Sequence, residues 1–402
     1  MRALFALCAL VLLAAAPFPR AKIVLGDEVF LTSAWQELGG RCAGIVTNQT
    51  GVTSALESVV DAARRNPKIC IKALFAPEHG LRGDRPAGSY VASYVDAKTG
   101  LPVYSLYGPT RRPTAAMLAG IDVLLFDIQD VGARTYTYVS TMAYVMEAAA
   151  QLGKEVWVLD RPNPIGGTMV EGPVLEPEFK SFIGLYPIAL RHGMTVGELA
   201  QMFDDAFGIH AKLRVIAMRG WKRSMLWPDT GLHWVQSSPN IPDWSTTLLY
   251  PCTGLIEAAG INNATSSAKP FAYAGILGLD AQSYADALNA RSLPGVYFRS
   301  AAWSPFAGFW AGKTLTGVEL VVYDERAFEP VRTAVELLVA AKRVMPSAIS
   351  IRSTHAIDTD WGTDSLRAGL VAGESAEHIV RGWDAGLAAF KAVRAKYLLY
   401  PD

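Results

Sequence analysis

Short apolar runs that are rich in β-branched residues alternate with helix-like stretches in the first half of the chain. From residue 43 onward the runs read AGIVTN, CIKALFAPEH, PVYSLYG, DVLLFDIQD, EVWVLDRPN and LRVIAMRGW. The clearest helical patterns are 136–152 and 195–207, and the second opens on a capping box at Thr195 and Glu198. Because such alternation is typical of βαβ units, it predicts an α/β fold with a Rossmann-like parallel sheet.

The pattern changes in the second half of the chain. A strand-like segment at 317–324 is followed by helical patterns at 329–344 and 375–397. A chain of 402 residues, 51% of them hydrophobic, is also too long for one ordinary core. We therefore expect a Rossmann-like catalytic domain over residues 22–243 and a smaller α+β domain over residues 244–402.

The N-terminus has the pattern of a targeting segment. The first 21 residues, MRALFALCALVLLAAAPFPRA, run from a basic residue through an apolar stretch to small residues and a proline break. This stretch is too short to cross a bilayer, and a buried helix that is apolar all round would need complete burial. Residues 1–21 are therefore predicted to be a secretory signal peptide. We expect the remaining chain to be exported, periplasmic or extracellular, with no membrane span.

Composition limits the partners and cofactors. Lys plus Arg equals Asp plus Glu at 37 each, so no basic excess indicates nucleic acid binding. The chain has neither a GxGxxG turn after its first predicted strand nor a P-loop, so we expect no nucleotide cofactor. Outside the signal segment, Cys42, Cys70 and Cys252 remain. A Cys42–Cys70 disulfide is one alternative, but three buried thiols are favoured.

Polar side chains follow five successive predicted strands. In open parallel sheets, ligands bind at the carboxyl ends of the strands, so these positions test for a site. Polar residues at five strand ends in succession favour a polar pocket over chance. They are Asn48, Gln49, Glu78, His79, Tyr107, Asp127, Gln129, Asp130, Asp160, Arg161 and Asn163.

Glu78 and His79 form one candidate catalytic pair. Glu78 follows Pro77 at the end of an apolar strand, where partial burial would raise its pKa and suit a general acid. A salt bridge from Glu78 to Arg82 within the same loop is the structural alternative.

A second candidate group follows the next buried strand. Asp127, Gln129 and Asp130 end this strand, and Arg134, Tyr136 and Tyr138 follow at the start of a helical pattern. Carboxylates beside aromatic and amide groups are what a sugar pocket requires. A capping network at the helix start would use the same residues.

Two proline-containing segments complete the candidate set. Asp160-Arg161-Pro162-Asn163-Pro164 predicts a rigid loop that presents side chains, although turn chemistry alone also explains its prolines and asparagine. Glu171-Gly172-Pro173 follows. No HExxH or paired-histidine spacing supports zinc, and we expect no metal, with an oxygen-rich magnesium or calcium site left open.

Several long motifs together resemble one family. They are LFAPEHGLRGDRPAG, VYSLYGPTRRPT, LLFDIQDVGARTYTYVSTM, VLDRPNPIGG, VEGPVLEPEFKSFIGLYPIALRHGMTVGELA, SPNIP and the final GTDSLR…FKAVRAKYLLY. In this order they closely resemble the exo-β-N-acetylmuramidases of the NamZ type. The resemblance implies a secreted glycoside hydrolase that removes terminal N-acetylmuramic acid from the non-reducing end of peptidoglycan fragments. It also implies a cleft between a Rossmann-like domain and a smaller C-terminal domain.

The resemblance assigns roles to individual residues. The glutamate of its PEHG motif falls on Glu78, the implied general acid, with His79 beside it. Asp127 and Asp130 are further catalytic candidates. The predicted substrate-binding residues are Asn48, Gln129, Arg134, Tyr136, Asp160, Arg161, Asn163, Glu171 and Asn240.

The second catalytic group, the contact to the substrate carboxylate and the function itself remain open at this point. The second carboxylate, Asp127, Asp130 or Glu171, would activate water or attack the sugar, or the 2-acetamido group of the substrate would attack instead. The arginine of the family's loop after LYPCTG has no counterpart here, and Lys269 is the nearby cation. The rival functions are a non-catalytic exported sugar-binding protein and a metal-dependent hydrolase that uses Glu78, His79 and Asp127.

Overall fold

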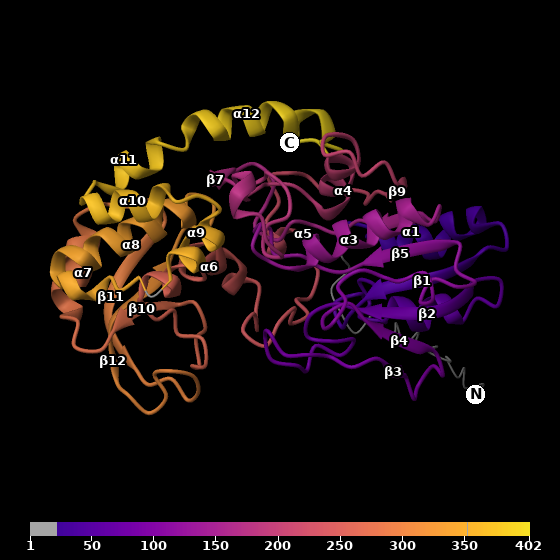
Figure 1. Cartoon of the computed structure of the whole chain (residues 1–402), viewed down its shortest axis with the longest axis horizontal. Helices are drawn as coiled ribbons and strands as arrows, with labels where there is room; N and C mark the ends of the chain where they lie inside the picture. The colour runs from indigo at the N-terminus through magenta and orange to yellow at the C-terminus, as the bar shows by residue number, and fades with distance from the viewer. Residues whose placement is uncertain (1–21, 352) are drawn as a thin grey trace, which may run out of the picture.

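The computed structural model describes residues 22–351 and 353–402, so the predicted signal peptide lies outside the described residues. Two bodies lie side by side in Figure 1. The first contains a seven-stranded sheet and the second a three-stranded sheet. Within the described ranges, no helix combines the length and the apolar character needed to span a membrane.

The large sheet has the predicted α/β architecture. Its strands lie in the order β3-β4-β2-β1-β5-β6-β9, and every neighbouring pair is parallel except β3 and β4. The chain leaves central β1 toward β2 and β4 and later returns to β5 on the other side of β1, so a crevice forms at their carboxyl ends. The strands are β1 (Cys42–Thr47), β2 (Cys70–Ala76), β3 (Tyr94–Val95), β4 (Pro102–Ser105), β5 (Val123–Asp127), β6 (Glu155–Leu159) and β9 (Lys212–Ile216).

Helices cover both faces of this sheet. In β5, Leu124 and Phe126 join one buried cluster with α3 and α4, whereas Val123 and Leu125 join another with α1 and α2. Because both faces of β5 are buried, its sequence is a continuous apolar run and does not alternate between apolar and polar residues. The predicted capping box is confirmed, since Thr195 accepts from the Glu198 amide and Glu198 accepts from the Thr195 amide. The helices of this body are α1 (Gly26–Thr32), α2 (Val59–Arg64), α3 (Tyr138–Gln151), α4 (Val196–Asp205) and α5 (Trp227–Thr230), and a small hairpin joins β7 (Glu171–Val174) to β8 (Ala189–Arg191).

The second body is a smaller α+β unit. Its antiparallel sheet has the order β10-β12-β11, with β10 (Tyr273–Ile276), β11 (Val296–Trp303) and β12 (Leu315–Val322). The helical pattern predicted at 375–397 is divided into α11, α12 and a 3₁₀ turn, with the first break at Gly382 and Trp383. The helices are α6 (Ser245–Thr253), α7 (Ala281–Asn289), α8 (Pro330–Val344), α9 (Thr354–Trp361), α10 (Ser365–Ala372), α11 (Ala376–Arg381) and α12 (Asp384–Arg394).

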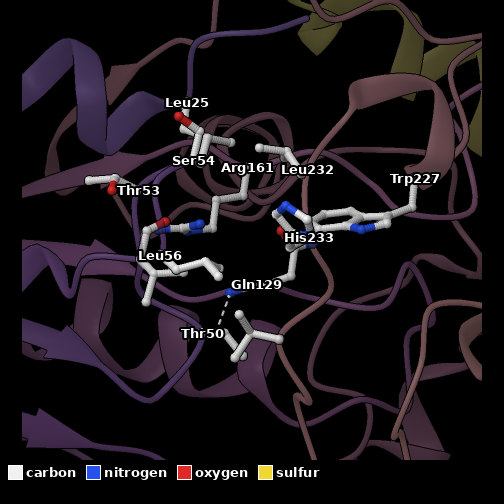
Figure 2. A pocket seen from close by; sticks show the side chains of 12 residues that line it. Leu25, Thr50, Thr53, Ser54, Leu56, Gln129, Arg161, Trp227, Leu232 and His233 are labelled. Carbon is white, nitrogen blue, oxygen red and sulfur yellow. Dashed lines mark hydrogen bonds between the residues drawn. The ribbon is translucent and has the colours of Figure 1, made fainter. Parts of the chain in front are cut away.

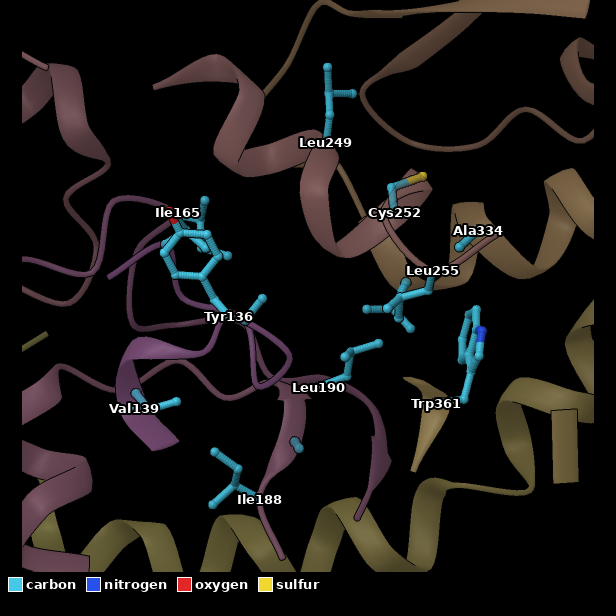
Figure 3. Close-up of a cluster of buried hydrophobic side chains, with 14 of the residues drawn as sticks. Tyr136, Val139, Ile165, Ile188, Leu190, Leu249, Cys252, Leu255, Ala334 and Trp361 are labelled. Carbon is cyan, nitrogen blue, oxygen red and sulfur yellow. The ribbon is translucent and has the colours of Figure 1, made fainter. Parts of the chain in front are cut away.

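One hydrophobic cluster runs through both bodies. Figure 3 shows Tyr136 and Leu190 of the first body near Leu255 and Trp361 of the second, all in the same buried cluster. The two bodies therefore share a core, and burial of apolar surface holds them together.

The chain returns to the first body near its end. α12 crosses from the second body toward α4 along the top of Figure 1. Beyond it, the Tyr400 hydroxyl donates to Asp160 Oδ2 at 2.5 Å, and its ring makes an edge contact with Trp221. Arg394 donates to the Gly193 carbonyl at 2.7 Å. A boundary near residue 243 remains a prediction, and the last residues of the predicted second domain pack on the first body.

A disulfide joins Cys42 to Cys70, which corrects the expectation of three buried thiols. The two residues are aligned at the start of the β1–β2 ladder, with Cα atoms 4.6 Å apart. The sequence places both cysteines near strand starts but does not give the register that makes them neighbours. Cys252 is a free, buried thiol.

We expect the Cys42→Ser, Cys70→Ser double variant to be destabilised by about 3–4 kcal/mol, because the disulfide closes a loop with a sequence separation of 28 residues. Urea denaturation of the oxidised wild type and the variant would measure this difference. Cys252→Ser is the control for loss of a thiol outside the disulfide. Equal midpoints for the oxidised wild type and the double variant would contradict the prediction.

Candidate functional site

A cavity of about 270 Å³ lies where the carboxyl edge of the large sheet meets the second body. The loop after β2 contributes Glu78 and His79, and the start of α3 contributes residues 135–138. The second body contributes mainly polar and aromatic groups. The other lining residues are Ala87, Ile183, Ser238, Asn240, Ile241, Tyr250, Gly254, Glu257, Asn263, Thr265 and Phe271.

Glu78 is held in this cavity by two hydrogen bonds. Its Oε1 accepts from the Gly88 amide at 2.8 Å, and its Oε2 accepts from the Thr137 hydroxyl at 2.6 Å. Glu78 is only 8% exposed. The expected alternative, a salt bridge to Arg82, is not formed, because Arg82 pairs with Asp96 at 2.8 Å. The carboxyl group is therefore fixed in direction while it still borders the cavity.

His79 stabilises the loop that surrounds Glu78. Its backbone is left-handed, with φ of 69°, and Gly80 follows with φ of 78°. The His79 Nδ1 lies 2.7 Å from the Arg85 carbonyl oxygen. This contact fixes the start of the segment that brings the Gly88 amide to Glu78, so one task of His79 is to shape the loop.

The buried Tyr136 and Tyr138 and the partly buried Tyr250 form one wall of the cavity. The ring of Tyr136 makes edge contacts with Tyr138 and Tyr250, at centroid distances of 4.8 and 5.6 Å. The hydroxyls of Tyr136 and Tyr138 donate to Oγ and to the carbonyl oxygen of Ser237, respectively, which ties the start of α3 to the residue just before the SPNIP motif. Burial raises the pKa of all three tyrosines, so they remain neutral donors near pH 7.

Asp130 lies behind this wall and is nearly buried. Its Oδ2 accepts from the Gly132 amide at 2.8 Å, while its Oδ1 has no hydrogen-bond partner among the described residues. Burial raises the pKa of Asp130 to about 7. His192 lies 3.9 Å away, but burial, together with the positive charge of Arg394, lowers the pKa of His192 to about 3. Asp130 is thus a carboxyl group that exchanges its proton near neutral pH without a cationic partner.

Asp127 is placed in a buried ion pair instead of the cavity wall. Arg161 donates to its two carboxylate oxygens at 2.6 and 2.9 Å, and the same guanidinium reaches Asp27 at 3.0 Å. All three side chains are nearly or fully buried. Desolvation raises the pKa of Asp27 to about 8. Arg161, which Asp27 shares with Asp127, offsets only part of this effect. This geometry favours a structural task for Asp127.

Four other predicted binding residues hold the loops of the sheet edge. Asp160 accepts from the Gly197 amide and caps α4, and Asn163 bridges the Ile165 amide and the Met194 carbonyl. Gln129 donates to the carbonyls of Asp130 and Pro162. Asn48 accepts from the amide and hydroxyl of Thr50. None of these four side chains lines the Glu78 cavity.

Gln129 and Arg161 border a separate and much smaller cavity of about 20 Å³. Figure 2 shows them near Trp227 and His233, with the hydrogen bond between Thr50 and Gln129 drawn as a dashed line. This volume holds about one water molecule, so it does not accommodate a sugar ring.

The last two predicted residues lie between the bodies. Glu171 accepts from Arg191 at 2.8 Å. Arg134 is 1% exposed and reaches the carbonyl oxygen of Asp360 at 3.2 Å. Neither side chain lines the Glu78 cavity, so of the thirteen predicted site residues Glu78, His79, Tyr136 and Asn240 do so.

Comparison with known proteins identifies the family. The N-terminal family model described as exo-β-N-acetylmuramidase NamZ matches residues 43–245, and the C-terminal model matches residues 248–400. The chain belongs to the NamZ exo-β-N-acetylmuramidase family. A curated relative, the peptidoglycan β-N-acetylmuramidase NamZ of Bacillus subtilis, is 45% identical over 381 residues, which cover 95% of this chain and 92% of the relative.

Two crystal structures of DUF1343 family proteins from Bacteroides fragilis share the fold. One is 37% identical with a TM-score of 0.90, covering 95% of this chain and 100% of that chain. The other is 26% identical with a TM-score of 0.75, covering 94% of this chain and 99% of that chain. The NamZ family assignment and this architecture therefore apply to nearly the whole chain.

The structure adds cavity residues that the sequence reasoning missed. Thr137, Tyr250, Glu257 and Asn263 all line the Glu78 cavity, together with Tyr138, which the sequence placed beside Tyr136. Thr137 stands in the VGARTYTY motif, which was a usable signal. Tyr250, Glu257 and Asn263 come from the second body. The prediction from strand ends of the large sheet does not cover residues of another body.

The cation considered for the altered loop is engaged elsewhere. Lys269 pairs with Glu319 at 2.6 Å and borders a different cavity, of about 320 Å³. Within the described ranges, no group of three His, Cys, Asp or Glu residues is arranged to hold a metal ion. Glu78, His79 and Asp127 are accordingly not assembled as one set of ligands.

The proton of Asp130 gives a stability prediction with a defined sign. The pKa of about 7 in the folded protein lies above the ordinary value of 3.8, so the folded state retains a proton that the unfolded chain releases between about pH 4 and 7. This stabilising contribution is present at low pH and is lost as pH rises toward 7. We expect the free energy of unfolding of wild type, relative to Asp130→Asn, to fall by about 1.4 kcal/mol per pH unit.

Urea denaturation at intervals between pH 4 and 8 would measure this slope. Asp84→Asn, which removes an exposed carboxylate near the same sheet edge, controls for the change in net charge. A difference between wild type and Asp130→Asn that does not vary with pH would contradict the assignment.

Proposed function

We propose that the chain releases terminal N-acetylmuramic acid from the non-reducing end of peptidoglycan-derived glycans, with Glu78 as general acid. The relative from Bacillus subtilis, named a peptidoglycan β-N-acetylmuramidase, supports the substrate class. The observation that carries the proposal is the Glu78 carboxyl group, which two hydrogen bonds fix at the wall of a cavity formed by both bodies. A cavity of about 270 Å³ with polar and aromatic lining is suited to a sugar unit.

The contacts of Glu78 are compatible with proton transfer. The Thr137 hydroxyl can donate to the carboxylate and, after rotation, accept from the carboxylic acid, so this contact holds Glu78 in either protonation state. The acid would protonate the glycosidic oxygen while positive charge develops on the sugar ring. The tyrosine wall supplies aromatic faces and neutral hydroxyl donors for the ring.

Glu257 is the second carboxylate that fits this reaction best. It lines the same cavity as Glu78 but comes from the second body. Asp127 and Glu171 are each held by an arginine and do not line the cavity. We assign Glu257 to stabilise the positive charge that develops on the sugar and to activate or replace the attacking water.

Export of the mature chain belongs to the same proposal. The sequence of residues 1–21 has the pattern of a signal peptide. The Cys42–Cys70 disulfide supports an oxidising compartment, because such bonds are rare in reducing cytosol. An exported enzyme would meet peptidoglycan fragments where they are released.

We expect Glu78→Gln to lose about 10²- to 10⁴-fold in kcat on a muramic acid–glucosamine disaccharide, because the leaving sugar requires a proton. The loss should be much smaller on a 2,4-dinitrophenyl muramic acid glycoside, whose leaving group departs without protonation. Release of free sugar and of dinitrophenol would be measured for both proteins. Equal losses on the two substrates would contradict a general-acid role for Glu78.

The same assays separate the rival functions. Sugar binding to wild type without turnover of either substrate would indicate a non-catalytic binding protein. Turnover that a chelator abolishes and an added divalent ion restores would indicate a metal-dependent hydrolase.

We expect Glu257→Gln to lower kcat on both substrates by at least about a hundredfold, because it acts on the sugar rather than on the leaving group. This pattern differs from the one expected for Glu78→Gln. Glu325→Gln, which removes a carboxylate of the second body beside another cavity, is the control. Near wild-type turnover of both substrates by Glu257→Gln would leave the second carboxylate unassigned.

A further inference from the structure

Arg111 presents a charged group that no carboxylate of the described chain neutralises. Its guanidinium lies over the ring of Phe182, 4.0 Å from the centroid, and 5.4 Å from the centroid of Tyr107. The side chain is exposed and has no ion pair within the described ranges. Arg112, its neighbour, differs, since it pairs with Glu147 at 2.5 Å. Stacking on aromatic faces orients the Arg111 guanidinium and leaves N–H groups at its edge for a ligand.

The aromatic support of Arg111 continues into the Glu78 cavity. Tyr107 contacts the Phe182 ring at a centroid distance of 5.9 Å. Its hydroxyl lies beside the Glu78 carboxylate, and burial together with this negative charge raises the pKa of Tyr107 to about 12. Ile183, the residue after Phe182, lines the cavity itself. Arg111 is thus separated from the proposed acid by one aromatic side chain.

An open hollow lies over the Arg111 loop. It encloses about 370 Å³ and is bordered by Gly108 and by the Tyr144 ring, which stacks on Phe182. A Cβ atom at Gly108 would lie only 2.4 Å from the Tyr90 ring, so this ring packs directly against the backbone of the loop. A stacked cation beside an open space is suited to a planar anion such as a carboxylate.

We propose that Arg111 binds the lactyl carboxylate of the muramic acid unit and thereby determines specificity for muramic acid over N-acetylglucosamine. This inference rests on the proposed function, because it names the substrate contact of the same site. The lactyl carboxylate is the feature that distinguishes the two sugars. The loop after Glu257 supplies no arginine for it, and Lys269 is held by Glu319 beside another cavity. Arg111 supplies the fork of donors that a carboxylate requires.

The test compares a 4-nitrophenyl muramic acid glycoside with the same glycoside whose lactyl carboxylate is converted to an amide. For Arg111→Gln we expect KM on the acid to rise about tenfold to a hundredfold with a small change in kcat, because a charge-assisted contact is lost. On the amide, wild type and Arg111→Gln should have similar KM values. Arg111→Lys should restore part of the affinity for the acid. Unchanged discrimination between acid and amide in Arg111→Gln would overturn the proposal.

Two further variants separate this contact from general electrostatics. Arg65→Gln removes an exposed guanidinium that pairs with Glu57 just beyond α2, and it controls for net charge. If Arg112→Gln raised KM on the acid as much as Arg111→Gln, the positive potential of the loop would be responsible and the assignment to Arg111 would be wrong.

Binding measurements keep this inference distinct from the proposed reaction. Calorimetry of free N-acetylmuramic acid and of N-acetylglucosamine with Glu78→Gln reports on recognition without turnover. One outcome is that N-acetylmuramic acid binds more weakly once Arg111→Gln is added, while wild type cleaves no glycoside. This outcome would contradict the proposed hydrolysis but not the role of Arg111. If wild type cleaves the glycoside but N-acetylmuramic acid and N-acetylglucosamine bind equally well, only the role assigned to Arg111 would be contradicted. If neither sugar binds, both proposals would be contradicted.

Discussion

A buried guanidinium organises the edge of the sheet on which the site depends. Arg161 follows β6 and binds Asp127 at the end of β5, Asp27 in α1 and the carbonyl oxygen of Val52 after β1. Four segments that are distant in sequence therefore meet at one charged group. Because an unpaired charge in such a place would be costly, the ion pairs fix these segments relative to one another. The sheet edge where the chain changes direction around β1 is consequently rigid. The less buried loop that carries Glu78 packs on this rigid edge.

The sequence predicts the architecture well, because the evidence for it is repeated along the chain. Apolar runs such as DVLLFD, buried on both faces, indicate a parallel sheet wherever they alternate with helical patterns. The predicted capping box at Thr195 is local and is confirmed as a local contact. The Cys42–Cys70 disulfide was considered from the sequence but not favoured, because it depends on register between strands, which no local pattern encodes.

The candidate site was predicted less completely, and the reason is physical. Polar residues at strand ends share one edge, but their side chains can face a ligand or one another. Glu78 borders the cavity, whereas Asp127 and Asp160 bind an arginine and a helix start, respectively. Composition does not distinguish these outcomes, since both use carboxylates beside donors. The contribution of the second body, including Glu257, depends on packing between elements far apart in sequence.

The hydrogen bond between Asp160 and Tyr400 has a consequence for the order of folding. It connects positions 240 residues apart, and Tyr400 belongs to the same small core as Ile23 and Trp221. During synthesis, the first body therefore lacks part of its core until residue 400 has emerged. Closure of such a long loop costs conformational entropy that only late contacts offset. Complete folding of the first body is thus delayed until residue 400 is available to close this core.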